Sequence, residues 1–337
     1  MRKMRSLALA FSASAAVAIL ALPAQALDEV AFGTNWVAEA EHGGFYQAMA
    51  DGTYEKFGLK VTIIAGGPQK DNRALLIADK VQFFMAGNML APLNANAQDV
   101  PVVELAAIFQ KEPQVLLVHP DSGVEKFEDL AKLPTLFMSL EGFGSYFQWM
   151  KQSFTGFKDE QYKPYHFDPQ VFITDKQSAM QGYVTSESLG IQKAAGFWPK
   201  EFLLADAGFD TPSTLIEAKA EYVAKNPDLV QRFVDASIIG WYTYLYGDPS
   251  KGNAAIKADN PEMSDEQIAF TIGKMKEYGI VDSGITLTKG IGCMDDAQQK
   301  SFYDKMVKAG AVPAGVDLAK VYTNQFVCKG VGMELKK

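Results

Sequence analysis

The stretch EHGGFYQAMADGTYEKFG, residues 41–58, decides how the first part of the chain is expected to fold. It begins with a histidine and two glycines and continues as a helix that ends at Gly58. The runs EVAFGT (29–34) and LKVTII (59–64) enclose it, and both are typical of strands. A strand, a helix and a second strand in this order predict a parallel sheet with helices packed on its faces.

The same alternation of strands and helices continues along the chain and divides it into two series. Further strands are expected at 81–86 and 100–109 in the first series and at 114–119 and 135–139 in the second; the helices are expected at 71–79, 89–97, 124–131, 145–154 and 178–184. From residue 221 onward the pattern is mostly helical, and Ser264 with Gln267 forms a capping box for one of these helices.

Two crossing segments are expected between the series. The first lies at residues 111–113, where Pro113 favours extended backbone in the residue before it, and the second lies near residues 209–218. About 310 residues follow the predicted leader, which is more than one hydrophobic core usually organises. The predicted division is therefore a leader (1–26), the first part of lobe I (27–112), lobe II (113–211) and the second part of lobe I with a helical C-terminal extension (212–337).

The first 26 residues have the pattern of a secretory signal peptide. Arg2, Lys3 and Arg5 precede an apolar run, and the small-residue motif AQA follows it, which predicts cleavage after Ala26 and a periplasmic location. Removal of this leader takes away three positive charges, so the formal net charge changes from -8 to -11. A protein this acidic is not expected to bind nucleic acid.

The cysteines and arginines limit the chemistry further. In an oxidising compartment a disulfide between Cys293 and Cys328 is the default expectation, with two buried free thiols as the alternative. Only Arg73 and Arg232 follow the predicted leader, so a sulfonate, phosphate or dicarboxylate would find few bidentate partners. The ligand is therefore not expected to be a small dianion.

Unusual residues gather where the expected strands end. In open α/β sheets a ligand lies beyond the carboxyl ends of the strands, where helix N-termini and free backbone amides converge. Glycine runs there let the backbone approach a bound molecule, although a single pair is more often a plain turn. Ser145 could also cap the helix that follows it. The candidate ligand-binding residues are Trp36, His42, Gly66, Gly67, Asn88, Gln114, Gly144, Ser145, Tyr183 and Glu187.

His42 has two open interpretations. No spacing of His, Cys and Asp resembles a zinc site, and neither a nucleophile elbow nor a Cys–His pair accompanies it, so neither a metal nor catalysis is expected. The residue either stabilises the turn or caps the helix, or it hydrogen-bonds a ligand as a neutral imidazole with one donor and one acceptor. No cofactor is expected.

Trp36 and Tyr183 lie near segment ends in opposite lobes, where they could hold a flat ring between them. Glu187 follows Tyr183 and precedes a helix. Its carboxylate either accepts N–H bonds from an aminopyrimidine-like edge or favours the helix dipole. Tyr46 and Tyr146 fall within expected helices and are assigned to the core.

Several of these motifs occur together in one known family. The runs NWVAEAEHGGFYQAMADGTYEKFGLKVTIIAGGP (35–68), ADKVQFFMAGN (78–88), GIGCMDDAQQKSFYDKMVKAGAV (290–312) and VYTNQFV (321–327) resemble the NMT1/THI5-like solute-binding proteins of bacterial ABC importers. The similarity is strongest to the members that capture thiamine pyrimidine precursors, and it covers nearly the whole chain after the leader.

The resemblance implies a type II periplasmic-binding-protein fold, with two αβ lobes, a two-strand hinge and a ligand held between the lobes. Such proteins deliver the ligand to an ABC permease and its ATPase and catalyse nothing. It also implies that Trp36 and Tyr183 hold the ring of a heterocyclic ligand and that Glu187 binds its amino edge. The expected ligand is of the formylaminopyrimidine or hydroxymethylpyrimidine type, and the expected protein is a monomer.

Other members of the family leave alternatives open. Neighbouring branches bind riboflavin, nitrate, taurine or alkanesulfonates, and the scarcity of arginine disfavours the last three. A subunit that presents a ligand to a membrane sensor is an alternative of another class. A yeast-type branch is an enzyme that makes the pyrimidine from its own histidine and pyridoxal phosphate, but its CCCFC motif does not occur in this sequence. A binding protein is therefore expected rather than an enzyme.

Overall fold

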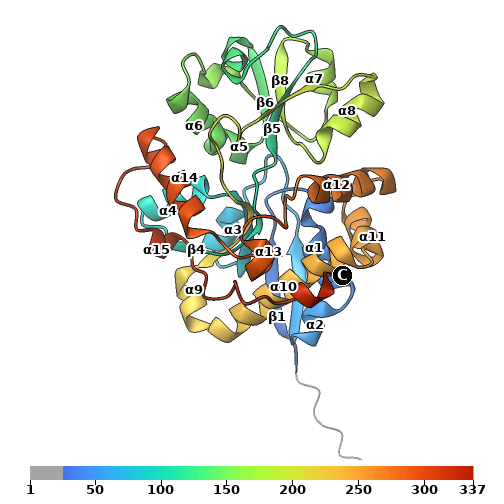
Figure 1. Ribbon diagram of the computed structural model, residues 1–337, viewed down its shortest axis with the longest axis vertical. Helices are drawn as coiled ribbons and strands as arrows, with labels where there is room; N and C mark the ends of the chain where they lie inside the picture. The colour runs from blue at the N-terminus through green and yellow to red at the C-terminus, as the bar shows by residue number, and fades with distance from the viewer. Residues whose placement is uncertain (1–25, 337) are drawn as a thin grey trace, which may run out of the picture.

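The computed structural model describes residues 26–336, which form two lobes, each built on a five-stranded sheet (Figure 1). Lobe I contains β1 (Asp28–Gly33), β2 (Leu59–Ile64), β3 (Phe83–Asn88), β4 (Val102–Phe109) and β10 (Ser213–Lys219), in the order β2-β1-β3-β10-β4. Lobe II contains β5 (Gln114–Val118), β6 (Thr135–Met138), β7 (Tyr162–Pro164), β8 (Ser178–Tyr183) and β9 (Lys200–Leu203), in the order β7-β6-β8-β5-β9. The predicted leader lies outside the described residues except for Ala26.

Each sheet is mixed, which corrects the expectation of parallel sheets. In lobe I, β1 pairs in parallel with β2 and β3, whereas β10 runs antiparallel to β3 and β4. In lobe II, β6 pairs in parallel with β7 and β8, whereas β5 runs antiparallel to β8 and β9. β5 and β10 are the strands that follow the two crossings. Each enters its sheet from the end that faces the other lobe, and it therefore runs opposite to the parallel strands.

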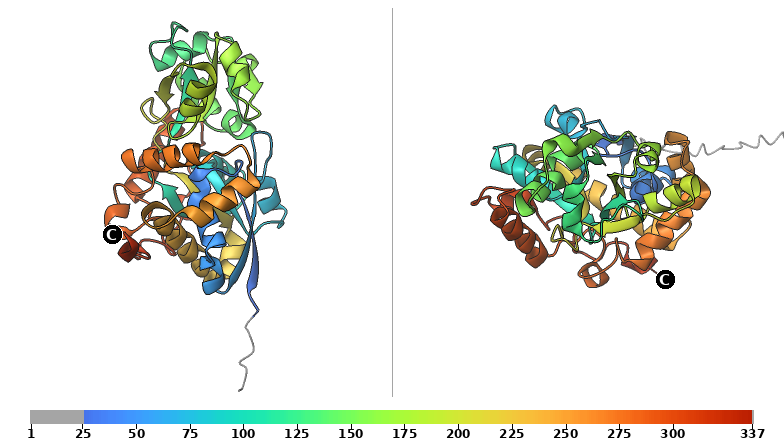
Figure 2. Two further views of the ribbon diagram at one scale, coloured as in Figure 1. Left: turned by 90° about the vertical axis from the view of Figure 1, so that its right-hand side faces the viewer. Right: turned by 90° about the horizontal axis from the view of Figure 1, so that it is seen from above.

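Helices surround both sheets and form the C-terminal part of the chain (Figures 1 and 2). The first group is α1 (Gly43–Ala50), α2 (Thr53–Lys56), α3 (Arg73–Ile77), α4 (Leu90–Ala97), α5 (Leu140–Gly144), α6 (Tyr146–Ser153), α7 (Gln170–Thr174) and α8 (Glu187–Ala195). The second group is α9 (Ala220–Lys225), α10 (Pro227–Tyr246), α11 (Ser250–Asp259), α12 (Asp265–Glu277), α13 (Thr286–Lys289), α14 (Asp296–Lys308) and α15 (Leu318–Val321). Short 3-10 helices are η1 (Ala40–His42), η2 (Phe127–Lys132), η3 (Asp159–Gln161) and η4 (Met333–Leu335). Between residues 26 and 336, no helix combines the length and apolar character that crossing a membrane requires.

Three expected elements differ in the structure. The helix expected through residue 57 breaks into α1 and α2, because Gly52 adopts a left-handed conformation with φ of 80°. Residues 178–183 form strand β8, not a helix. Both faces of this central strand are covered, so its sequence lacks the alternation that identifies a half-exposed strand. The helix expected at 124–131 is the shorter 3-10 helix η2.

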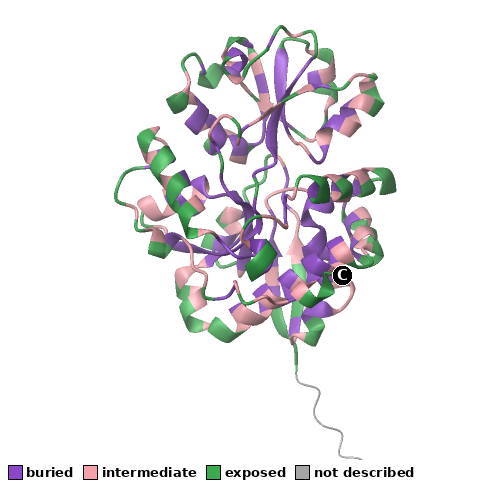
Figure 3. Cartoon of the chain, in the orientation of Figure 1, coloured by how far each residue is buried: buried purple, intermediate pink, exposed green. Residues whose placement is uncertain are grey.

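The two glycines after His42 allow close packing of α1 on α10. A Cβ atom at Gly43 would lie 2.0 Å from the ring of Tyr244, and one at Gly44 would lie 2.2 Å from the indole of Trp241. Both aromatic rings are buried in the core of lobe I. Figure 3 shows that buried segments, in purple, occupy the centre of each lobe. These glycines are therefore required by the helix interface and not by a ligand.

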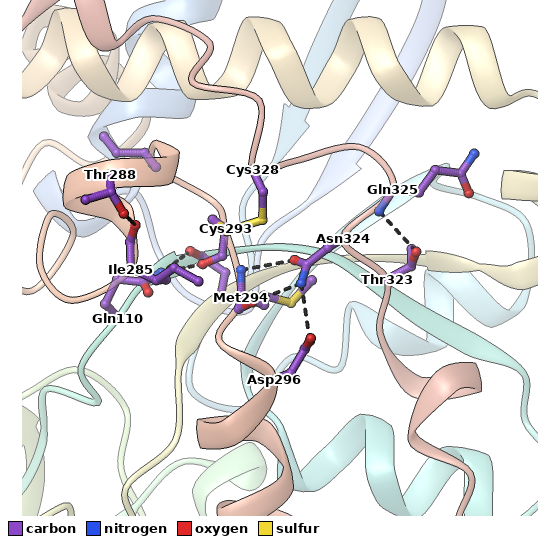
Figure 4. Close-up of a disulfide and its surroundings, with 12 residues drawn as sticks. Gln110, Ile285, Thr288, Cys293, Met294, Asp296, Thr323, Asn324, Gln325 and Cys328 are labelled. Carbon is purple, nitrogen blue, oxygen red and sulfur yellow. Dashed lines mark hydrogen bonds between the residues drawn. A yellow bond between two sulfur atoms is a disulfide. The ribbon is translucent and has the colours of Figure 1, made fainter.

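A disulfide between Cys293 and Cys328 closes the C-terminal segment onto lobe I (Figure 4). The two Cα atoms lie 4.6 Å apart, and the alternative of two free thiols is thereby excluded. Beside the bridge, the side chain of Asn324 makes two hydrogen bonds to the backbone of Met294. It accepts one from the Met294 N–H (3.1 Å) and donates one to the Met294 carbonyl oxygen (2.9 Å). These contacts fix the segment that leads into α14.

Candidate functional site

The main candidate site is a cavity between the two lobes, with about 580 Å³ of empty space including the part open to solvent. Its walls come from the carboxyl ends of the parallel strands, from the amino ends of β5 and β10, and from the segments next to them. The lining residues are Asn35, Trp36, Glu39, His42, Met85, Gly87, Asn88, Glu112, Gln114, Ser139, Glu141, Gly142, Ser145, Tyr146, Gln181, Gly182, Tyr183, Glu187 and Thr214.

Most of the residues proposed from the sequence line this cavity, and three glycines do not. The lining includes Trp36, His42, Asn88, Gln114, Ser145, Tyr183 and Glu187. Gly66 packs against the backbone before Trp36, because a Cβ atom there would lie 2.4 Å from the carbonyl oxygen of Thr34. Its N–H donates to the carbonyl of Trp36 at 3.0 Å, so Gly66 supports the loop that carries the indole. Gly67 lies outside the lining, and Gly144 lines a separate depression beside Arg73.

The indole of Trp36 extends from lobe I toward aromatic side chains of lobe II. It stacks on Tyr165 with ring centroids 6.2 Å apart and an interplanar angle of 22°, and Phe167 meets it edge-on at 6.1 Å. Tyr183 lines the same cavity from the end of β8. The sequence did not point to Tyr165, which follows a short edge strand. The binding of a ligand ring between Trp36 and Tyr183 stays a prediction.

Carboxylates dominate the charged groups of the lining, which contains Glu39, Glu112, Glu141 and Glu187. Burial raises the pKa of Glu39 and of Glu112 well above the usual range, and nearby carboxylates raise both pKa values further. Burial also raises the pKa of Glu187 to about 8, although the Tyr183 N–H bond opposes this. No lysine or arginine from the described part of the chain belongs to the lining. The cavity is therefore rich in hydrogen-bond acceptors.

Two glutamates, Glu141 of the lining and Glu41 outside it, accept hydrogen bonds from the opposite lobe. Glu141 of lobe II accepts hydrogen bonds from the Asn35 side chain (2.7 Å) and from the Gly87 backbone N–H (3.0 Å) of lobe I. Glu41 of lobe I accepts a buried hydrogen bond from the Thr185 hydroxyl at 2.6 Å. Thr185 lies in the turn between Tyr183 and Glu187, so this contact positions both of these cavity residues.

Helix α12 of the C-terminal part contacts the same turn of lobe II. Thr271 donates from its hydroxyl to the carbonyl oxygen of Thr185 (2.9 Å), and the Gln267 side chain donates to that of Ser186 (3.0 Å). Ser264 caps this helix as predicted, because its hydroxyl accepts a bond from the Gln267 N–H. The reciprocal half of the predicted capping box is not formed, because the Gln267 side chain donates to Ser186 instead. The β8–α8 turn is therefore held by two elements of lobe I.

His42 is buried at the start of α1, and burial lowers its pKa to about 3. The imidazole is therefore neutral at physiological pH. It makes no capping bond to α1, and its Nδ1 has no hydrogen-bond partner within residues 26–336. The structure excludes the helix cap, whereas stabilisation of the turn and contact with a ligand both stay predictions. Over the same residues, no cluster of His, Cys, Asp and Glu could hold a metal ion.

Sequence reasoning missed several polar residues of the cavity. Tyr146 is buried as expected, but its hydroxyl donates to Gln181 at 3.0 Å and its ring lines the cavity. Ser145 precedes α6 without a capping bond, and Ser139 instead caps α5 by accepting a bond from the Gly142 N–H. A signal for Ser139 was present in the sequence, because it is the third residue before Gly142 and the last residue of the strand expected at 135–139.

Solved structures with this architecture include periplasmic binding proteins. A protein of Bordetella bronchiseptica RB50 has a TM-score of 0.68 at 14% identity, with 92% of this chain and 98% of that chain covered. The putative periplasmic sulfonate-binding protein SsuA of Methylobacillus flagellatus KT, described as part of an ABC transporter, has a TM-score of 0.57 at 17% identity, with 93% and 96% covered. The chain has the periplasmic-binding-protein fold, and the predicted fold class is confirmed.

Sequence comparison then identifies the family. The model described as NMT1/THI5 like matches residues 39–251, and the chain belongs to this family. The 4-amino-5-hydroxymethyl-2-methylpyrimidine phosphate synthase of Aspergillus parasiticus is 28% identical over 104 residues, which is 31% of this chain. The match spans only 30% of the length of that curated relative.

Proposed function

We propose that this protein is the periplasmic solute-binding component of an ABC importer and captures a flat nitrogen heterocycle. A thiamine pyrimidine precursor of the formylaminopyrimidine or hydroxymethylpyrimidine type fits best. The observation that carries this proposal is the composition of the interlobe cavity, where aromatic rings accompany four carboxylates and no described cation. Such a lining suits a ring whose edge carries N–H donors, and a permease with its ATPase would receive the ligand.

The same lining opposes small anions. An ionised glutamate and an anionic ligand 4 Å apart repel each other by about 4 kcal/mol at an effective dielectric constant of 20. The raised pKa values of Glu39, Glu112 and Glu187 keep these groups protonated without a ligand, so a bound anion would hold them in that state. Nitrate, taurine and alkanesulfonates would also find no guanidinium or ammonium group among the described residues of the lining. Arg73 lies near the cavity, but its guanidinium is paired with the buried Glu217 at 2.9 Å.

In this proposal Trp36 and Tyr183 hold the two faces of the ring, and Glu187 binds its amino edge. Glu187 already accepts the backbone N–H of Tyr183 with one carboxylate oxygen, at 2.6 Å. The second oxygen is left for an exocyclic amino group of the ligand. His42 supplies one further polar contact as a neutral imidazole.

A synthase is the second candidate, because the curated relative is a pyrimidine phosphate synthase. This chain aligns with less than a third of that enzyme. Cys293 and Cys328 of this chain are both used in its disulfide. A binding protein releases its ligand unchanged, whereas a synthase forms pyrimidine phosphate. Mass spectrometry of a ligand recovered after incubation therefore separates the two candidates.

Thermal unfolding with a panel of compounds tests the proposed ligand class. The panel contains aminopyrimidines, riboflavin, nitrate and taurine. A ligand at 100 times its dissociation constant adds about 2.7 kcal/mol to stability, which for a chain of this size raises the melting temperature by roughly 5 °C. Aminopyrimidines are expected to give this rise. A rise with nitrate or taurine and none with any aromatic heterocycle would overturn the proposal, and a rise with riboflavin alone would select that alternative.

Two substitutions test the residue roles. Trp36→Ala is expected to weaken heterocycle binding about 30-fold, because it removes a stacking surface worth about 2 kcal/mol. Trp198→Ala is the matched control, since this tryptophan is 53% exposed and lies outside the cavity. Glu187→Gln is expected to weaken aminopyrimidines selectively. Equal losses for every ligand would assign Glu187 a purely structural role.

A further inference from the structure

Glu112 is a buried glutamate in the first connection between the lobes, between β4 and β5. Its side chain is 2% exposed and lines the cavity. One carboxylate oxygen accepts the backbone N–H of Gln114 at 3.1 Å. The other oxygen, Oε2, is buried and has no hydrogen-bond partner anywhere in the described chain. A buried acceptor left without a partner is costly, and it is normally satisfied by a ligand or by water.

The charge of Glu112 is also uncompensated by the protein. Burial raises its pKa well above the usual range, and the carboxylate of Glu141 raises it further. The adjacent Lys111 is directed elsewhere, because its ammonium group donates to the carbonyl oxygen of Tyr278 at 2.9 Å. Within the described residues, no ion pair includes Glu112 or Glu141. Either a proton or the ligand therefore neutralises this group.

The carboxylates of the cavity form two separate groups. Glu39 interacts electrostatically with Glu41 and Glu187, whereas Glu112 interacts with Glu141. Glu187 is the residue assigned to the amino edge of the ring. Glu39 resembles Glu112 in being buried with one unpartnered oxygen, so each group offers a free acceptor. A ligand that satisfies both groups needs an N–H donor on the ring edge and a second donor elsewhere on the molecule.

We propose that Glu112 determines specificity by binding a protonated amine arm of the ligand, so that the substrate class is an aminopyrimidine with a separate primary ammonium group. This inference rests on the proposed function and changes one part of it, because the arm of the pyrimidine is a free ammonium group and not the formylamino or hydroxymethyl group named there. An ammonium group supplies both the hydrogen-bond donor and the positive charge that the Glu112 carboxylate lacks. A hydroxymethyl arm supplies a donor without charge, and a formylated amine supplies a neutral N–H.

Isothermal titration calorimetry with three matched compounds tests the inference. The compounds are 4-amino-2-methylpyrimidines that carry an aminomethyl, a hydroxymethyl or a formylaminomethyl group at ring position 5. The wild-type protein is expected to bind the aminomethyl compound at least tenfold more tightly than the other two. Glu112→Gln is expected to weaken the aminomethyl compound at least tenfold, since it removes the charged partner of a buried ion pair. The same variant should bind the hydroxymethyl compound within about threefold of wild type, which also shows that the cavity is intact.

Glu29→Gln is the matched control, because Glu29 is an exposed glutamate at the far end of β1. It is expected to leave all three affinities unchanged. Tight binding of the hydroxymethyl or formylaminomethyl compound, with equal or weaker binding of the amine, would overturn the ammonium assignment and leave the proposed function standing. An unchanged preference in Glu112→Gln would likewise overturn the role of this residue. Failure of all three compounds to bind would refute the proposed function together with the inference.

Discussion

The buried carboxyl group of Glu41 makes the stability of the protein depend on pH. Burial raises its pKa from 4.5 to about 7, although the hydrogen bond from Thr185 partly opposes this effect. A raised pKa means that the folded protein holds the proton more tightly than the unfolded chain. Its stabilising contribution is therefore complete below pH 4.5 and is lost as the pH rises through 7.

The magnitude follows from the pKa change. One pKa unit corresponds to about 1.4 kcal/mol, so the free energy of unfolding is expected to fall by about 2–3 kcal/mol between pH 5 and pH 8 because of Glu41 alone. Burial also raises the pKa values of Glu39 and Glu187, and their contributions have the same sign. Guanidinium titrations of the ligand-free protein at several pH values in this range measure the slope.

Glu41→Gln isolates the contribution of this residue. The amide keeps an oxygen that accepts the Thr185 hydroxyl bond, and it cannot ionise. The variant is expected to show a shallower slope than wild type and to exceed it in stability at pH 8. Glu29→Gln, at an exposed position, is expected to keep the wild-type slope. Wild-type stability that stays constant or rises from pH 5 to pH 8 would contradict this reasoning, as would an equal slope in Glu41→Gln.

Two further predictions concern the stability of lobe I. Replacing Cys293 and Cys328 together by serine is expected to cost about 4 kcal/mol in guanidinium unfolding, since the bridge closes a loop with a sequence separation of 35; an unchanged midpoint would contradict a bridge in the purified protein. Gly240→Ala is expected to cost about 2 kcal/mol or more, because its Cβ atom would lie 2.2 Å from the backbone oxygen of Gly44, which cannot move aside. Gly273→Ala, a helical position with open space around it, should be neutral or slightly stabilising, and equal losses at the two glycines would refute the packing argument.

The sequence predicted the two-lobe plan because strand and helix lengths, together with the break before Pro113, are local properties. The direction of β10 was not predictable in this way. It depends on the end of the sheet at which the chain returns from lobe II, which is a property of the whole topology. β8 was missed because a strand covered on both faces shows no alternation of polar and apolar residues.

The candidate site was predictable where it depends on strand ends. Trp36 lies shortly after β1, as expected, and it lines the cavity. Tyr183 also lines the cavity, but it was proposed from the end of an expected helix that is the strand β8 in the structure. Glu39 and Glu112 could not be singled out, because an acidic residue in a connecting segment is usually exposed to solvent. Their burial results from the approach of the other lobe. Gly66 was assigned to ligand contact, but its role is to support the loop of Trp36.

The pairing of β4 with β10 and of β5 with β9 has a mechanical consequence. One connection between the lobes joins β4 to β5, and the other joins β9 to β10. Because β4 pairs with β10 and β5 pairs with β9, the two connections run next to each other. Rotation of one lobe about a line through them changes only a few backbone angles, whereas sliding one lobe across the other would distort both connections. The cavity therefore opens most easily on the side away from the connections. A solute that enters on that side reaches Glu112 last. The part of the solute that enters the cavity first is therefore the part that contacts Glu112.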